Sequence, residues 1–159
     1  MAMMIALALV FSYVETLIPI NFGIPGVKLG LANLVIVAVI YLFGGKEALL
    51  VSVVRIFLSG FMFGNLASIM YSLAGGLLSL AVMLLLKKTD KLSILAVSVM
   101  GGICHNIGQL IVAMLVVENL KLIFYVPVLL ISGFVTGLLI GVVSRVILPA
   151  VKRALESGR

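Results

Sequence analysis

Nine side chains of this sequence carry chemistry suited to binding a small molecule. They are Glu15, Lys28, Asn33, Arg55, Asn65, Tyr71, His105, Asn106 and Gln109. Most of them interrupt long apolar runs, where an ionisable group is energetically expensive and calls for a role. Lys28 and Arg55 are cations that suit a ligand carrying a carboxylate or a phosphate. The set therefore predicts a binding site for a small anionic molecule.

Aromatic and amide groups extend this prediction to the rest of the ligand. Tyr71, Tyr125 and Phe22 offer rings on which a ligand ring could stack. His105 and Gln109 stand four residues apart, so a helix would place both on one face. A vitamin, a flavin or quinone precursor, or a short isoprenyl phosphate would fit such a site.

Two alternative interpretations give these residues structural roles. In one, Arg55 pairs with Glu15 and fastens two helices together. In the other, His105 makes a hydrogen bond to a neighbouring helix. Neither alternative explains why so many polar groups are expected at one depth, so both stay open beside the ligand site.

The sequence lacks the residue sets of common catalytic sites. Gly44-Gly45-Lys46 is followed by Glu47 and has no leading glycine at the spacing of a phosphate-binding loop. One histidine and one cysteine cannot form a zinc site alone. Asp90 is the only aspartate, so the paired aspartates that would hold magnesium for prenyl transfer are missing. A single histidine likewise supports no Ser-His-acid set. We expect no enzymatic activity, no metal and no cofactor.

The composition is that of an integral membrane protein. Of the 159 residues, 64% are hydrophobic and 10% are charged, and the mean hydropathy is +1.42. A soluble domain holds about 45–50% apolar and about 25% charged residues. The basic residues that give the net charge of +6 lie mainly in short gaps between apolar runs. This pattern indicates orientation in a membrane, and we expect no nucleic-acid partner. The first run lacks a basic leader and a convincing cleavage site, so we expect a first span and not a signal peptide.

Six apolar runs are long enough to predict a bundle of six transmembrane helices in a single domain, residues 1–159. A spanning helix needs about 20 residues, with a range of about 17–25. Proline, glycine and charged residues divide the chain into runs at about 1–18, 29–43, 47–62, 66–86, 93–117 and 124–150. The prediction is an all-α protein that crosses the bilayer repeatedly.

The charges between the runs predict the direction of crossing. If the N-terminus is cytoplasmic, the inner gaps and the tail hold Lys46, Lys87, Lys88, Lys91, Lys152, Arg153 and Arg159, and the outer gaps hold only Lys28 and Lys121. Because cytoplasmic loops are enriched in Lys and Arg, both termini are predicted to be cytoplasmic, in a prokaryotic plasma membrane. This orientation places the predicted binding residues in the outer half of the bundle, under a turning segment from Pro19 to Gly30.

Small residues at intervals of four predict where helices make close contact in lipid. Gly133, Gly137 and Gly141 form one stripe on the last run, which we interpret as packing inside the bundle. Ala2 and Ala6 form a second pair, near the cytoplasmic end of the first run.

Three segments carry a resemblance to a known family. They are Pro25-Gly-Val-Lys28-Leu-Gly30-Leu-Ala-Asn33, Arg55-Ile-Phe-Leu-Ser-Gly60-Phe-Met-Phe-Gly64 and His105-Asn106-Ile-Gly-Gln109. They resemble the "Gx transporter" family, which is also described as heptaprenyl diphosphate synthase component I. The resemblance covers nearly the whole chain, and its two descriptions imply different functions.

The first description implies transport. The chain is similar to the substrate-binding S components of energy-coupling factor (ECF) importers, which are six-span proteins with both termini inside. That resemblance implies capture of a small vitamin-like or precursor molecule from outside, and partners consisting of a transmembrane scaffold subunit and two ABC ATPases. In S components an Ala-xxx-Ala pair on the first helix contacts the scaffold, and Ala2 and Ala6 match it in type and location. Transport is the function we prefer from the sequence.

The second description implies a membrane accessory subunit of a heptaprenyl diphosphate synthase in quinone biosynthesis. It explains the missing aspartates, because a partner would hold them. It does not explain the predicted outer polar site, since prenyl synthesis is cytoplasmic. A stand-alone channel or ion-coupled carrier is a weaker alternative, because the sequence shows no inverted repeat and no acidic relay.

Overall fold

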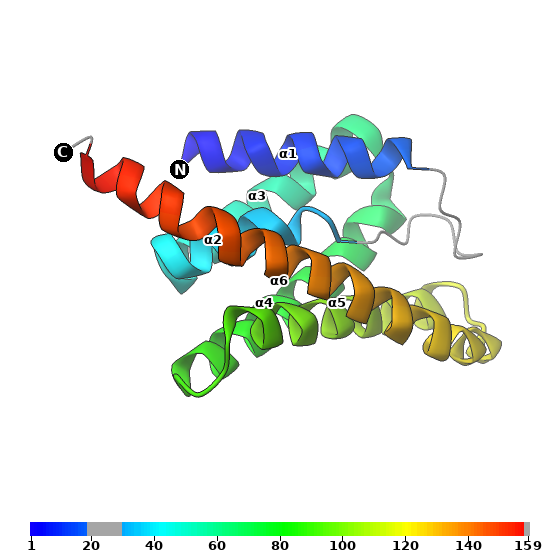
Figure 1. Ribbon diagram of the computed structural model, residues 1–159. Coiled ribbons are helices and arrows are strands. Elements are labelled where there is room, and N and C mark those ends of the chain that lie inside the picture. Colours follow the sequence, from blue (N-terminus) through cyan, green and yellow to red (C-terminus); the bar gives the residue numbers. More distant parts are fainter. Residues whose placement is uncertain (19–29, 158–159) are drawn as a thin grey trace.

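The computed structural model describes residues 1–18 and 30–157, which form six α-helices and one short 3-10 helix (Figure 1). This part of the chain is all-helical, as the sequence predicts. The α-helices are α1 (Ala2–Leu17), α2 (Asn33–Leu42), α3 (Gly45–Phe63), α4 (Leu66–Lys88), α5 (Ile94–Val116) and α6 (Val126–Ser157). The 3-10 helix η1 (Leu120–Tyr125) leads directly into α6.

Each predicted apolar run contains one helix, with two notable differences at the boundaries. The second helix begins at Asn33 and not near residue 29, because Gly30 has a φ of +85° and a turn follows it. The last helix continues past residue 150, through Pro149, to Ser157. Charged residues ended that run in the sequence, yet Lys, Arg and Glu are good helix formers. Arg153 also donates a 3.3 Å hydrogen bond to the Pro149 carbonyl within this last part.

Helix α5 packs between α4 and α6, and glycines allow the close approach (Figure 1). A β-carbon at Gly102 of α5 would lie 2.4 Å from the Gly133 carbonyl oxygen and 3.1 Å from the Gly137 α-carbon. On the other side of α5, a β-carbon at Gly108 would lie 2.8 Å from the Ala74 carbonyl oxygen of α4. The predicted packing role of the last glycine stripe is therefore confirmed.

The remaining helices complete the bundle. Helix α1 runs along α3, and α2 packs against α3 and α6. Their shared core is built from small and branched side chains that are at most 2% exposed, among them Ala8, Val35, Ile36, Val39, Ile40, Ala48 and Val51. The two termini of the described chain lie at the same end of the molecule (Figure 1).

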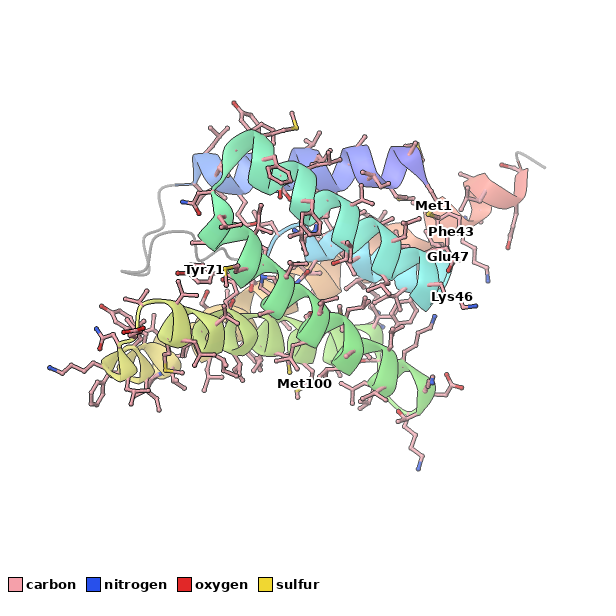
Figure 2. The ribbon with its side chains drawn as sticks, turned by 180° about the vertical axis from the view of Figure 1, so that it is seen from behind. Met1, Phe43, Lys46, Glu47, Tyr71 and Met100 are labelled. Atoms are coloured by element: carbon pink, nitrogen blue, oxygen red, sulfur yellow. The ribbon has the colours of Figure 1, made fainter. Side chains whose placement is uncertain are left out.

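That shared end carries most of the positive charge, and we call it the basic end. It holds Lys46, Lys87, Lys88, Lys91, Lys152 and Arg153, at or beside the ends of α3, α4, α5 and α6. Figure 2 shows Met1, Phe43 and Lys46 together at this end, with Tyr71 toward the opposite side of the molecule. Lys87 links α4 to α2 at this end, because its Nζ donates a 2.5 Å hydrogen bond to the Ile40 carbonyl oxygen of α2.

Three stretches of the described chain are long and apolar enough to cross a membrane: Leu66–Lys88, Ile94–Val116 and Leu120–Ser157. Helices α1 and α2 are apolar but shorter, and α3 contains Lys46, Glu47 and Arg55. Large apolar side chains cover the outside of the bundle, such as Phe61 at 77% exposure and Leu115 at 71%. Such a surface is typical of a protein in contact with lipid. The count of six spans and the direction of crossing stay predictions.

Candidate functional site

Ionisable and amide side chains from four helices are buried in the bundle. Glu15 of α1 is 6% exposed, Asn33 of α2 is 5% exposed, Arg55 of α3 is 3% exposed and His105 of α5 is 2% exposed. Buried polar groups are retained where hydrogen bonds or ligands satisfy them. We call these four residues, with Gly30, Gln109 and Ser12, the buried polar cluster.

Gly30 lies at the centre of three of these side chains. Its backbone N–H donates a hydrogen bond to Oε1 of Glu15. A β-carbon at Gly30 would lie 3.0 Å from Cδ2 of His105 and 3.2 Å from Nδ2 of Asn33. Its positive φ is a conformation that glycine adopts without strain. Because residue 30 has no side chain, its backbone lies close to side chains of α1, α2 and α5.

His105 and Gln109 share one helical face, as their spacing predicts. The Nε2 atoms of the two side chains lie 2.5 Å apart, and Gln109 is fully buried. Helix α4 covers the imidazole from the other side, since a β-carbon at Gly75 would lie 3.1 Å from Nδ1 of His105. The histidine is held between Gly30 and Gly75, so its ring has little freedom to move.

Arg55 reaches toward α1 and α4 from the middle of α3. Its Nη1 donates a long hydrogen bond of 3.5 Å to Oγ of Ser12. Its Nη2 would lie 3.9 Å from a β-carbon at Gly76 of α4. Within residues 1–18 and 30–157, Nε and Nη2 of Arg55 have no hydrogen-bond partner. Each N–H of a buried guanidinium left without an acceptor costs free energy, so this side chain is chemically suited to receive an anion or a carbonyl.

The charges of Arg55 and Glu15 attract each other, and their direct pairing stays a prediction, because the hydrogen bonds described for the two side chains have other partners. The Glu15 carboxylate accepts from the Gly30 backbone, while the hydrogen bond of Arg55 goes to Ser12. Both side chains nonetheless belong to one buried region, because Ser12 and Glu15 lie one turn apart on α1.

Three predicted site residues lie outside the buried polar cluster. Asn65 is exposed and caps α4, where its Oδ1 accepts a 2.8 Å hydrogen bond from the backbone of Ser68. Asn106 faces α6, and its Nδ2 donates a 2.8 Å hydrogen bond to the Leu129 carbonyl oxygen. Tyr71 is buried in an apolar cluster with Leu110, Ala113 and Leu129. For each of them the described contacts provide a role in helix structure or packing.

The other predicted residues are exposed or lie outside the part of the chain that the structure describes. Lys28, Phe22 and the segment from Pro19 to Leu29 lie outside the described residues. Tyr125 is 38% exposed at the end of η1. Ala2 and Ala6 are exposed on α1 near the basic end, so their surfaces are open to a partner.

Sequence reasoning missed two members of the cluster. The sequence placed Gly30 in a motif and at the end of a turning segment without a role in the site, although a glycine just before a helix is itself a signal for an unusual backbone conformation. Ser12 was overlooked because a lone serine in an apolar run is common, yet its position three residues before Glu15 places it on the same face. No group of three or more His, Cys, Asp or Glu residues is gathered within the described ranges.

Comparison with known proteins decides the family. Residues 4–147 match the family described as heptaprenyl diphosphate synthase component I. The chain belongs to this family. The matched region includes every member of the buried polar cluster, and it confirms the resemblance under that description. No curated protein and no solved structure matches the chain, and the likeness to ECF S components stays a prediction.

Proposed function

We propose that this chain is the membrane-embedded, non-catalytic component of a two-part prenyl diphosphate synthase. The family match over residues 4–147 is the observation that carries the proposal. The apolar exterior and the three long apolar helices support a role in the membrane. This reverses the preference drawn from the sequence, because the matched family is described by the synthase and not by transport.

The residue inventory supports a division of labour between two components. Prenyl transfer uses carboxylates to hold Mg²⁺ ions that bind the diphosphate group. This chain has five acidic residues in all and a single aspartate, Asp90. A partner with its own carboxylates would carry out the transfer, and this chain would hold that partner at the bilayer, where the apolar product belongs.

The basic end is the surface that suits such a partner. Lys46, Lys88, Lys91, Lys152 and Arg153 are exposed there. With the predicted orientation this end faces the cytoplasm, and clustered cations attract an acidic protein surface.

A pull-down from native membranes tests the proposal. The tagged protein is extracted in a gentle detergent and its partners are identified by mass spectrometry. We expect a soluble prenyl synthase to co-purify, and its activity to rise when the purified chain is added back in lipid nanodiscs. A synthase whose activity and location do not depend on this chain would contradict the proposal.

A second function is favoured by one specific observation. Among the described residues, two nitrogens of the buried Arg55 guanidinium have no hydrogen-bond acceptor. A cytoplasmic anchor does not require such a group, whereas a protein that captures a small anion would use it. An S component of an ECF-type importer would bind such a molecule in the buried polar cluster. It would contact a scaffold subunit through Ala2 and Ala6.

The same pull-down separates the two functions. Recovery of a multi-span scaffold with ABC ATPases, and without a prenyl synthase, would favour import. In that case Arg55→Ala should abolish uptake of the anion while Ala2→Leu should abolish capture of the scaffold. Unchanged uptake in the Arg55→Ala variant would remove the anion site.

The orientation has its own test. In a Cys104→Ser background, one cysteine is introduced at Lys46 or at Lys121 and labelled in intact cells with a membrane-impermeant maleimide. We expect labelling at position 121 and none at position 46 until the membrane is opened. The opposite pattern would invert the predicted topology.

A further inference from the structure

A groove runs along the outside of α3 and α4 and opens at the basic end. Its volume is about 820 Å³. Among the residues that line it are Lys46, Leu49, Leu77, Ala81, Leu85 and Lys88. One lysine comes from each helix, and every other lining residue is apolar. Figure 2 shows Lys46 at this end of the molecule, beside Phe43 and Met1.

The two lysines of the groove are available to a ligand. Lys46 and Lys88 are exposed. The neighbouring Lys87 is engaged elsewhere, because its Nζ bonds to the Ile40 carbonyl oxygen and lies 4.9 Å from the centre of the Tyr41 ring. The Glu47 carboxylate does not line the groove and lies toward the start of α3. The charged part of the groove is therefore purely cationic.

The apolar part of the groove extends away from these charges along α4. Leu77 and Lys88 are eleven residues apart, which corresponds to about 16 Å along a helix. Leu77, Leu85 and Leu49 are 42%, 64% and 44% exposed, so their side chains offer apolar surface to an occupant. Ala81 lies between Leu77 and Leu85, and its small side chain leaves more room in the groove at that point.

We infer that this groove binds an isoprenyl diphosphate, with the diphosphate on Lys46 and Lys88 and the apolar tail along the leucines of α4. The inference rests on the proposed synthase function and adds a ligand and a place to it. The charge pattern complements this class of molecule, which has several negative charges at one end and a single flexible apolar chain. A phospholipid carries one phosphate diester and two chains, so it matches a two-lysine, single-channel groove less well.

The location also suits the reaction. A chain-elongating synthase makes a product that becomes more apolar with each added unit, and that product must leave water. A groove that begins at the predicted cytoplasmic end and continues along the lipid-facing side would accept the tail while the diphosphate stays at the surface. The buried polar cluster lies deeper in the bundle and is not part of this groove.

Binding to the full chain in phosphatidylcholine nanodiscs tests the inference, with geranylgeranyl diphosphate as the probe and empty nanodiscs as the blank. A cation near an anionic headgroup contributes about 1 kcal/mol, which corresponds to about a fivefold change in affinity. We expect Lys46→Gln and Lys88→Gln each to weaken binding about fivefold, and the double variant about 25-fold. The matched control is Lys91→Gln, which removes an exposed charge from the same end but outside the groove.

A second variant tests the apolar part without changing charge. Ala81→Phe fills the groove, so it should weaken binding of geranylgeranyl diphosphate while leaving binding of inorganic diphosphate unchanged. A benzophenone-tagged prenyl diphosphate should crosslink to residues between Leu77 and Leu85. Crosslinks confined to the other helices would overturn the assignment.

Two results distinguish a specific groove from general attraction. If Lys91→Gln weakens binding as much as Lys46→Gln, the effect is surface charge alone and the inference is wrong. If phosphatidylglycerol in the nanodisc displaces the probe as effectively as unlabelled prenyl diphosphate, the groove is a general lipid contact. Measurements on the unmodified chain keep the two proposals apart. If that chain captures the synthase but does not bind geranylgeranyl diphosphate, the groove assignment is wrong and the synthase function stands. If it binds the probe but captures no synthase, the synthase function is wrong.

Discussion

Replacing Gly30 with alanine should disturb the buried polar cluster through a single added carbon. Gly30 has a φ of +85°, a conformation that costs about 1–2 kcal/mol once a β-carbon is present. That carbon would also lie 3.0 Å from Cδ2 of His105 and 3.2 Å from Nδ2 of Asn33, so both side chains must move. A side chain driven off its rotamer costs about 0.5–1.5 kcal/mol.

The expected loss of stability for Gly30→Ala is therefore about 2–3 kcal/mol, from backbone strain and displaced side chains together. For a chain of this size, each kcal/mol lowers the melting temperature by about 2–4 °C. We expect a decrease of about 4–12 °C, measured by thermal unfolding in detergent.

The sharper measurement follows the histidine itself. His105 is the only histidine in the sequence, so ¹⁵N-histidine labelling yields the ring signals of one residue by NMR. Gly44→Ala is the matched control, because Gly44 also has a positive φ, of +120°, but its β-carbon would approach only the Glu47 carboxylate. Both variants should lose stability, and only Gly30→Ala should shift the ring signals of His105.

Two results would refute this reasoning. Unchanged His105 signals in Gly30→Ala would mean that the glycine does not hold the ring. Equal shifts in both variants would mean that the signals report general destabilisation and not contact within the cluster.

Three further predictions concern stability. Gly102→Ala should destabilise the protein by about 1–3 kcal/mol, because its β-carbon would meet backbone atoms of α6. Gly101→Ala should lose less stability, because its β-carbon would meet the flexible side chain of Met83. Equal stability of the two variants would contradict the close contact between α5 and α6. Asn106→Leu should cost about 0.5–1.5 kcal/mol, since it removes the hydrogen bond that Asn106 donates to the Leu129 carbonyl. Unchanged thermal unfolding would show that this bond is dispensable. Arg55→Met should lower the melting temperature of the ligand-free protein, because it removes a positive charge that interacts with the buried Glu15 carboxylate. A raised melting temperature would show that burial of the guanidinium costs more free energy than this attraction returns.

The positions of the helices followed from the sequence alone. Apolar runs bounded by proline, glycine and charge located all six helices, because backbone groups away from water must be satisfied within a helix. The predicted run at 66–86 lies within Leu66–Lys88, and the glycine stripe from Gly133 to Gly141 packs against α5. The pairing of His105 with Gln109 was also predictable, since helical spacing places residues four apart side by side.

Which polar groups meet was decided only by tertiary structure. Successive residues of a helix point about 100° apart, so His105 joins the cluster while Asn106 bonds to α6. Arg55 reaches Ser12, 43 residues away in the chain, and no local pattern distinguishes that partner from Glu15. Periodicity determines which residues share a face of one helix. The neighbour that each face meets depends on how the helices are rotated and packed, and glycines at the contacts decide how closely they approach.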